Sequence, residues 1–220
     1  MLFADLLEIH DPEPHAAALN MAIDEMLLRQ PTRPTLRIYR WLEPTVSFGY
    51  FGKIADAEMV ARGRPVVRRW TGGGIVEHGE DLTYTIIVPR EHPMLRFNAI
   101  ESYRMIHEVI AGLLNGEGMR AEIAGVASTL PVTACFAQPV QHDVVVGAKK
   151  LAGAAQRRTR WGMLHQGSIQ SPTSLDALRN KLAAAFGEQV SRQKLSASIE
   201  EDALRLASEK YGTPAWLRKY

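Results

Sequence analysis

Three consecutive glycines, Gly72 to Gly74, interrupt the stretch RRWTGGGIVEH between two segments rich in β-branched residues. Glycine weakens a strand interior, so a run of three indicates a turn or a place where the backbone approaches another group closely. The flanking segments RPVVRRW and DLTYTIIVP read as strands, so the triplet is predicted to join two β elements. Arg68 and Arg69 stand directly before it, and backbone amides beside a guanidinium form a donor set for an anion. A β-turn or bulge without a ligand explains the glycines equally well.

Hydrophobic periodicity places the other elements. Helices are predicted over residues 15–29, 98–115, 174–186 and 198–210. Strands are predicted over 35–41 and 45–51, as a pair around the turn LEP, over 143–146, from residue 150 onward, and over 161–170, which is expected to be the last strand. Strands bounded by short turns, with helices inserted between them, indicate an α+β fold.

Composition excludes several classes of protein. A chain of 220 residues with 46% hydrophobic and 23% charged residues is expected to fold as one globular domain. Its formal charge of +2 comes from scattered basic residues, which argues against nucleic-acid binding. Acidic residues near the start do not fit a signal peptide, and no apolar run approaches the roughly 18 residues of a membrane span. The predicted location is cytoplasmic, without a membrane partner.

Two side chains in the second half are candidates for chemistry. Lys150 stands where a strand is predicted to begin, and the small residues after it leave room for a bulky neighbour, so its ammonium could neutralise an oxyanion or a phosphate. Lys149 is assigned to the preceding turn. The single cysteine, Cys135, excludes an intrachain disulfide, and the seven histidines show no metal-ligand spacing. Cys135 is either buried packing or a nucleophile whose thiolate is stabilised by Lys150 or a histidine.

The ordered set of motifs resembles the lipoate–protein ligase and octanoyltransferase family, which is related in fold to biotin–protein ligases. It comprises LNMAIDEML, RWLEPTVSFGYF, RRWTGGGIVEH, GAKKLAGAAQRR, LHQGSI and EKYGTPAW. The segment CFAQPVQHDVVVGAKK is most similar to the cysteine-containing octanoyltransferases of Gram-positive bacteria. The resemblance implies a mixed, largely antiparallel sheet packed by helices. It also implies a single catalytic domain over residues 1–220, without the C-terminal accessory domain of many ligases.

The resemblance further implies the site residues. Lys150 matches the lysine of the family pattern Lys-x-x-Gly through Gly153, whereas Lys149 does not. Cys135 and Lys150 are the implied catalytic pair. The implied acyl- or adenylate-binding residues are Arg69, Thr71, Gly72, Gly73, Gly74, His78, Gly153, Ala154, His165 and Gly167. No metal ligand is expected among them.

Three activities are consistent with these motifs. The first is an acyltransferase that moves octanoyl or lipoyl to a lysine of a lipoyl domain through a Cys135 thioester, with acyl carrier protein as donor and no cofactor. The second is an ATP- and Mg-dependent lipoate–protein ligase, or its catalytic subunit, acting through a lipoyl-adenylate and Lys150. The third is a non-catalytic acyl-binding module. The expected acceptors are the lipoyl domains of 2-oxoacid dehydrogenases or the glycine cleavage H protein.

Overall fold

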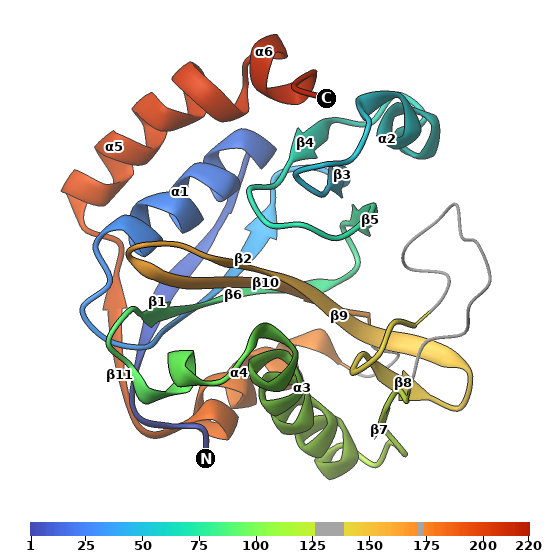
Figure 1. Cartoon of the computed structure of the whole chain (residues 1–220), viewed down its shortest axis with the longest axis vertical. Coiled ribbons are helices and arrows are strands. Elements are labelled where there is room, and N and C mark those ends of the chain that lie inside the picture. The colour runs from blue at the N-terminus through green and yellow to red at the C-terminus, as the bar shows by residue number, and fades with distance from the viewer. Residues whose placement is uncertain (126–138, 171–173) are drawn as a thin grey trace.

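The structure is a computed structural model and describes residues 1–125, 139–170 and 174–220. Within these residues the centre is an eight-stranded sheet with the order β11-β1-β2-β6-β10-β9-β8-β7 (Figure 1). Its strands are β1 (Phe3–His15), β2 (Thr35–Trp41), β6 (Leu82–Pro89), β7 (Glu122–Ile123), β8 (Val144–Val146), β9 (Lys149–Arg158), β10 (Gly162–Ile169) and β11 (Gly187–Lys194). β1 pairs in parallel with β11 and β2, and the remaining pairs are antiparallel. The predicted α+β fold with a mixed, largely antiparallel sheet is confirmed.

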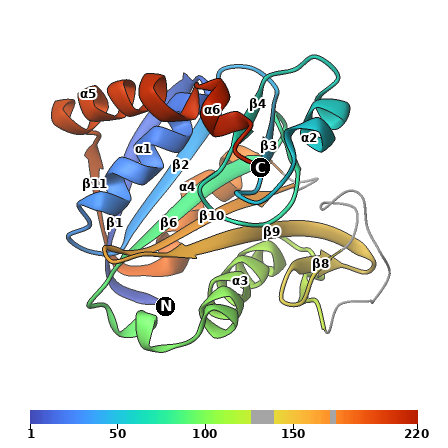
Figure 2. The ribbon, with the colours of Figure 1, turned by 45° about the horizontal axis from the view of Figure 1, so that its top comes forward.

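Helices cover both faces of this sheet (Figures 1 and 2). On one face lie α1 (Ala17–Arg29) and α5 (Ala197–Leu206), and on the other α3 (Ala99–Gly116) and α4 (Leu175–Phe186). A hydrophobic core lies on each face of the sheet. Because successive side chains of a strand point to opposite faces, Ile86 of β6 packs with α3 and α4 in one core, whereas Ile87 packs with α1 in the other. The sheet is therefore buried on both sides.

A second, three-stranded sheet with the order β4-β3-β5 stands beside the first. It consists of β3 (Thr45–Phe48), β4 (Val66–Arg68) and β5 (Val76–His78), and α2 (Ile54–Ala61) packs on Val46 and Phe48. The glycine triplet connects β4 to β5. It therefore joins two β elements as predicted, although the second is β5 rather than the longer β6.

Three short helical pieces complete the described residues: a 3₁₀ helix (Pro93–Arg96), a π-helical turn (Ala207–Tyr211) and α6 (Pro214–Leu217). In both views the C-terminus lies close to β3 and β4 (Figures 1 and 2). Across the described ranges, every helix is too short or too polar to cross a membrane.

The predicted helices are all present, and the 198–210 helix is α5 continued by the π-helical turn. Asn98 and Glu101 form a capping box that fixes the start of α3. The predicted pairing of 35–41 with 45–51 is wrong, because β2 lies between β1 and β6 while β3 belongs to the small sheet. The expectation that 161–170 is the last strand is also wrong, since β11 follows α4. Sequence analysis did not predict β1 either.

Candidate active site

A cavity lies between the two sheets, where the glycine loop (residues 69–75) faces β9 and β10. Its walls come from α1, β2, β3, β5, β6, the glycine loop, β9 and β10. Among the residues that line it are Ser47, Arg69, Gly73, Gly74, His78, Lys150, Gly153, Ala154, Gln166 and Gly167. Polar groups and small residues thus converge on one concave, partly open space, the usual form of a ligand site.

Lys150 is held in this cavity by a buried carboxylate. Its side chain is 8% exposed, and its ammonium lies 2.8 Å from Oδ2 of Asp143, which is fully buried. Asp143 also accepts hydrogen bonds from the Tyr103 hydroxyl at 2.6 Å and the Val140 amide at 2.7 Å. The Tyr103 oxygen in turn accepts from the Ala154 amide at 3.0 Å, so α3, β8 and β9 are tied together at the lysine. A preorganised ammonium of this kind can stabilise negative charge on a reacting carbonyl oxygen.

The Lys-x-x-Gly spacing has a steric cause in this structure. Val144 pairs with Ala152 and Val145 with Lys150, so Leu151 is an extra residue on β9, as in a β-bulge. A Cβ built on Gly153 would lie 2.6 Å from the Lys150 ammonium nitrogen and 3.2 Å from Asp143 Oδ1. The lysine and its carboxylate therefore occupy the space that a side chain at position 153 would fill.

Replacing Gly153 with alanine is expected to reduce turnover by about a hundredfold, because the methyl group displaces the ammonium from Asp143 by an ångström or more. The unfolding free energy should fall by about 1–3 kcal/mol, the usual cost of an added methyl group in a packed interior, since the overlapping atoms are the end of a flexible side chain that can shift. Gly72→Ala is the matched control, as no atom lies within 4 Å of a Cβ built there. Steady-state rates and urea melts on both variants test this, and equal activity of the two would contradict it.

The glycine loop closes on the small sheet. A Cβ on Gly49 would overlap the Gly73 carbonyl oxygen, and Gly73 has a φ of +80°, so neither position suits a side chain. Arg69 donates to the carbonyl oxygens of Gly72 at 3.1 Å and Gly74 at 2.7 Å. The triplet thus lets two backbone segments meet at one wall of the cavity, and Arg69 holds its shape.

Arg68 points away from the cavity into a cage of carbonyl oxygens. It donates to Tyr50 and Gly52 at 2.7 Å each, to Trp216 at 2.9 Å and to Leu217 at 2.7 Å. The Trp216 indole returns a hydrogen bond of 2.9 Å to the Arg68 carbonyl. Arg68 therefore fastens the segment around α6 to the base of the glycine loop.

Ser47, His78 and Asp81 form a hydrogen-bonded chain along another wall. Ser47 Oγ lies 2.6 Å from His78 Nε2, and His78 Nδ1 lies 2.8 Å from Asp81 Oδ2. Burial raises the pKa of Asp81, but the adjacent His78 and hydrogen bonds from Ser168 and other groups lower it overall. Since the ionised carboxylate only accepts, His78 donates from Nδ1 to Asp81. Ser47 accepts from Arg69 at 2.6 Å, so the chain also orients that guanidinium.

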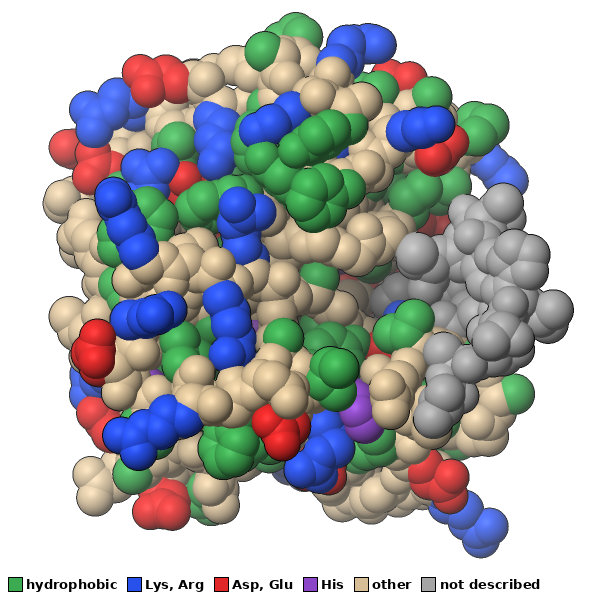
Figure 3. All heavy atoms as spheres, in the orientation of Figure 1, with side chains coloured by type: hydrophobic (Ala, Val, Ile, Leu, Met, Phe, Trp, Pro, Cys, Tyr) green, Lys and Arg blue, Asp and Glu red, His purple; other side chains and the backbone are tan. Residues whose placement is uncertain are grey.

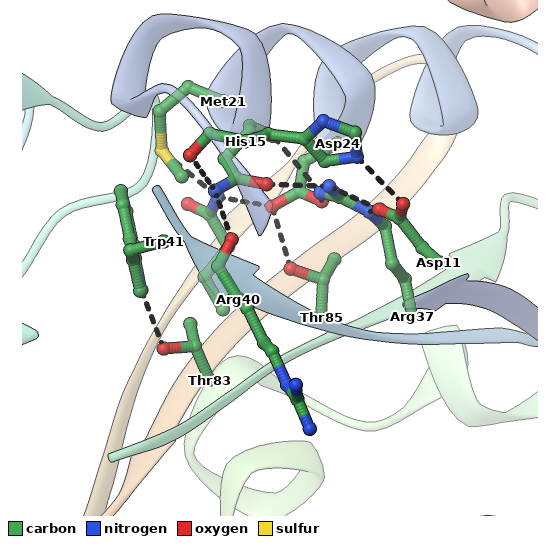
Figure 4. A network of polar contacts seen from close by, with 11 residues as sticks. Asp11, His15, Met21, Asp24, Arg37, Arg40, Trp41, Thr83 and Thr85 are labelled. Atoms are coloured by element: carbon green, nitrogen blue, oxygen red, sulfur yellow. Dashed lines mark hydrogen bonds and ion pairs between the residues drawn. The ribbon is translucent and has the colours of Figure 1, made fainter. Parts of the chain in front are cut away.

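A buried polar network joins Arg37 on β2 to Asp11 on β1 and Asp24 on α1 (Figure 4). Arg37, with no exposed side-chain surface, pairs with Asp11 and Asp24 at 2.7 Å each. Asp24 also accepts from the Gln166 amide at 2.7 Å, and the Gln166 oxygen accepts from the Thr71 hydroxyl at 2.8 Å. The Thr71 hydroxyl therefore already has a protein partner, and Asp24 of α1 holds it in place through Gln166 of β10.

His165, a residue of β10, does not line the cavity. Its ring lies in a buried cluster with Tyr103 and His107 of α3. Its ring nitrogens lie 3.1 Å from the Tyr84 hydroxyl and from the Gln156 amide nitrogen. Next to it, His107 donates from Nδ1 to the His142 carbonyl at 2.6 Å. Burial lowers the pKa of His107 to about 4 and that of His165 well below its ordinary value, so both are neutral at pH 7.

These two histidines predict acid lability. In the unfolded chain both have a pKa near 6.5, so between pH 6.5 and 4 the unfolded state binds protons that the folded state does not. The unfolding free energy is therefore expected to fall as pH falls, with His107 alone contributing about 2 kcal/mol between pH 7 and 4.5. Urea denaturation at both pH values measures this loss. This loss of unfolding free energy should be smaller in His107→Gln, and it should equal that of wild type in a variant of the exposed His10. A loss in His107→Gln as large as in wild type would contradict the role of His107.

Most of the site residues suggested by the sequence meet in the cavity. They are Arg69, Gly73, Gly74, His78, Lys150, Gly153, Ala154 and Gly167. Thr71 and Gly72 belong to the loop that forms one wall, and His165 lies elsewhere. Cys135 lies outside the described residues. Sequence analysis missed Asp143, Ser47 and Gln166, which no spacing rule singles out.

Comparisons with known proteins agree with this architecture. The model of the lipoyl protein ligase A/B catalytic domain matches residues 16–210. The chain is 38% identical over 213 residues to octanoyltransferase LipM of Kyrpidia tusciae, covering 87% of this chain and 74% of that protein. It is 35% identical over 213 residues to octanoyltransferase LipM of Brevibacillus brevis, covering 88% and 75%.

Two solved structures share the fold. Lipoate-protein ligase A bound with ATP superposes with a TM-score of 0.79 at 22% identity, over 99% of both chains. A bi-partite lipoate protein ligase from Thermoplasma acidophilum gives 0.77 at 21% identity, over 99% of this chain and 97% of that one. The resemblance drawn from the ordered motifs is confirmed, and the chain belongs to the lipoyl protein ligase A/B catalytic domain family.

Proposed function

We propose that this enzyme is an octanoyltransferase, which moves an octanoyl group from the thioester of acyl carrier protein to a lysine of a lipoyl domain through Cys135. The observation that supports acyl transfer rather than ATP-dependent ligation is a sequence comparison: over most of its length this chain is 35–38% identical to proteins named octanoyltransferase. The structures named as ligases share only 21–22% identity with it. The acceptor is a lipoyl domain of a 2-oxoacid dehydrogenase or the glycine cleavage H protein.

The cavity supports an acyl chain beside a cation. Met21, Val76, Ala154 and Ala155 contribute apolar surface, while Lys150 supplies an ammonium group in the same space. An octanoyl chain would gain roughly 0.8 kcal/mol for each methylene group taken from water, and the carbonyl oxygen would lie toward Lys150.

The transfer proceeds in two balanced steps. First the Cys135 thiolate attacks the donor carbonyl; a carbon–sulfur bond to the enzyme forms, the bond to the carrier breaks, and the carrier leaves as a thiolate that takes up a proton from water. Then the neutral acceptor amine attacks the enzyme thioester, an amide bond forms, Cys135 leaves as thiolate, and the nitrogen releases a proton. Lys150 stabilises the oxyanion in both steps and orients the carbonyl. A thioester is already activated, so the route requires no ATP.

Intact-protein mass after incubation with octanoyl-acyl carrier protein, without ATP, tests the first step. Wild type is expected to gain one octanoyl group that hydroxylamine removes, and Cys135→Ala is expected to gain none. If wild type forms no adduct, but lipoate with ATP and magnesium yields lipoyl-adenylate or a modified lipoyl domain, the transferase proposal is wrong and the enzyme is a ligase.

A further inference from the structure

Cations and aromatic rings alternate along one face of the molecule. The rings come from the segment after β3, the glycine loop, the β9–β10 turn and the C-terminal segment, and they are Tyr50, Phe51, Trp70, Trp161 and Tyr220. The cations among them are Arg29, Arg157, Arg160, Lys210 and Lys219. Together these residues are called the cation–aromatic surface. Figure 3 shows Lys and Arg side chains intermingled with hydrophobic ones on this face.

The contacts along this surface are continuous. Arg160 lies 4.5 Å from the Trp161 ring centre, and the Trp161 and Trp70 ring centres are 6.4 Å apart. Arg157 bridges Trp70 at 4.6 Å and Tyr50 at 4.9 Å. Lys219 then lies 4.8 Å from Tyr50, so residues from distant parts of the sequence form one patch. Distances below about 6 Å fall within the range of cation–π attraction.

The positive charge of this surface is largely unpaired. Of the acidic side chains in the described residues, Glu25 alone forms an ion pair with any of the five cations, contacting both Arg29 and Lys210 at 2.5 Å. Five cations with one carboxylate give the group a side-chain charge of +4, against +2 for the whole chain. Burial lowers the pKa of Lys210, and although Glu25 raises it, Arg29 and Arg157 lower it further. Within the described residues, Arg157, Arg160 and Lys219 therefore form no ion pair, and the group carries a net positive charge.

Exposed rings add a second property of binding surfaces. Phe51 is 73% exposed and Tyr220 53% exposed, and their rings contact each other in a tilted arrangement with ring centres 5.6 Å apart. Tyrosine, tryptophan, phenylalanine and arginine are the residues enriched at protein interfaces and among their strongest contacts. A basic surface with these rings fits an acidic protein rather than a small anion.

The surface adjoins the cavity without containing Lys150. Trp70 directly precedes Thr71 in the loop that forms one cavity wall, and Arg157 follows Lys150 by seven residues on β9. An extended strand advances about 3.3 Å per residue, so the Arg157 end lies roughly 20 Å from Lys150. A partner seated at that end therefore reaches Lys150 only with a long arm. A lysine side chain has four methylene groups, whereas an acyl carrier domain bears its thioester on a long flexible prosthetic arm.

We propose that the cation–aromatic surface docks the acyl donor, an acidic carrier domain whose arm delivers the thioester to the cavity. This inference rests on the proposed octanoyl transfer. The domain's carboxylates would face Arg157, Arg160 and Lys219, and its apolar surface would cover Phe51 and Tyr220. Charge at such an interface speeds association and selects the partner.

Binding of a stable donor analogue tests the proposal without turnover. The probe is acyl carrier protein carrying octanoate through an amide in place of the thioester. In the double variant Arg160→Glu/Lys219→Glu, the Kd for this probe is expected to rise by about tenfold or more. The reason is that two cations that attract the acidic carrier are replaced by anions that repel it. Lys194→Glu is the matched control, since Lys194 is exposed on β11, and it should bind as wild type does. Raising ionic strength should weaken wild-type binding more than binding by the double variant.

An equal Kd in wild type and the double variant would overturn the docking surface. So would a double variant that binds the carrier normally but loses affinity for an unmodified lipoyl domain, because the surface would then serve the acceptor. If wild type binds the probe through these residues but forms no Cys135 adduct from the thioester, the octanoyl-transfer proposal fails and the docking surface stands.

Discussion

Replacing Lys150 with methionine is expected to lower octanoyl transfer by about 10²–10³-fold. The ammonium lies in the cavity beside Asp143, and loss of one preorganised group that stabilises an oxyanion has an effect of this size. The measurement is the rate at which acyl-enzyme forms and decays, followed by quenched-flow mass spectrometry. Lys149→Met is the matched control, because Lys149 is adjacent in sequence but exposed, and it should retain wild-type rates.

The same substitution leaves Asp143 buried without its cation, although Tyr103 and Val140 still donate to it. Removal of one partner of a buried ion pair costs about 3–5 kcal/mol, so rates must be compared for fully folded protein, as checked by circular dichroism. Wild-type rates in a folded Lys150→Met variant would show that the lysine is structural and would remove it from the mechanism.

Replacing Arg37 with methionine is expected to lower the free energy of unfolding by about 3–5 kcal/mol, which is a large part of what holds an average domain folded. The reason is that Asp11 and Asp24 share this fully buried guanidinium, and both carboxylates lose it together. Burial raises the pKa of Asp11, yet His15 and Arg37 lower it overall, which indicates an ionised partner.

Urea denaturation measures the Arg37 effect, with Arg33→Met as control. Arg33 pairs with Asp5 at 3.0 Å, but their side chains are 35% and 51% exposed, so the control should lose less than about 1 kcal/mol. Similar losses in the two variants would mean that the buried network contributes no more than a surface ion pair.

The sequence predicted α1, α3, α4, α5 and the central strands because their hydrophobic periodicity is strong, whereas the short helices α2 and α6 were not predicted. It did not predict β1 and β11, for different physical reasons. β11 has the sequence GEQVSRQK, mostly exposed at a sheet edge, so it lacks an apolar alternation. β1 contains two prolines and pairs with strands far away in sequence, β2 and β11. Pairing partners at such separation are fixed by tertiary packing and leave no local pattern.

The candidate site shows the same division. Lys150, Arg69 and the glycines stand in short motifs, so the sequence could propose them. Asp143 could not be assigned as the partner of Lys150, because the extra residue Leu151 on β9 determines how the two side chains meet. Ser47 reaches His78 only because β3 pairs with β5, and that small sheet was not anticipated.

The cage around Arg68 has a consequence for the order in which the protein matures. Its acceptors on Trp216 and Leu217 lie 148 and 149 residues away from Arg68 along the sequence. Chains are made from the N-terminus, and early segments begin to fold before later ones have been synthesised. Arg68, at the base of the glycine loop, therefore lacks two of its hydrogen-bond acceptors until Trp216 and Leu217 have emerged from the ribosome. A nascent chain can thus form most of its sheet before the wall of the cavity is fixed in place.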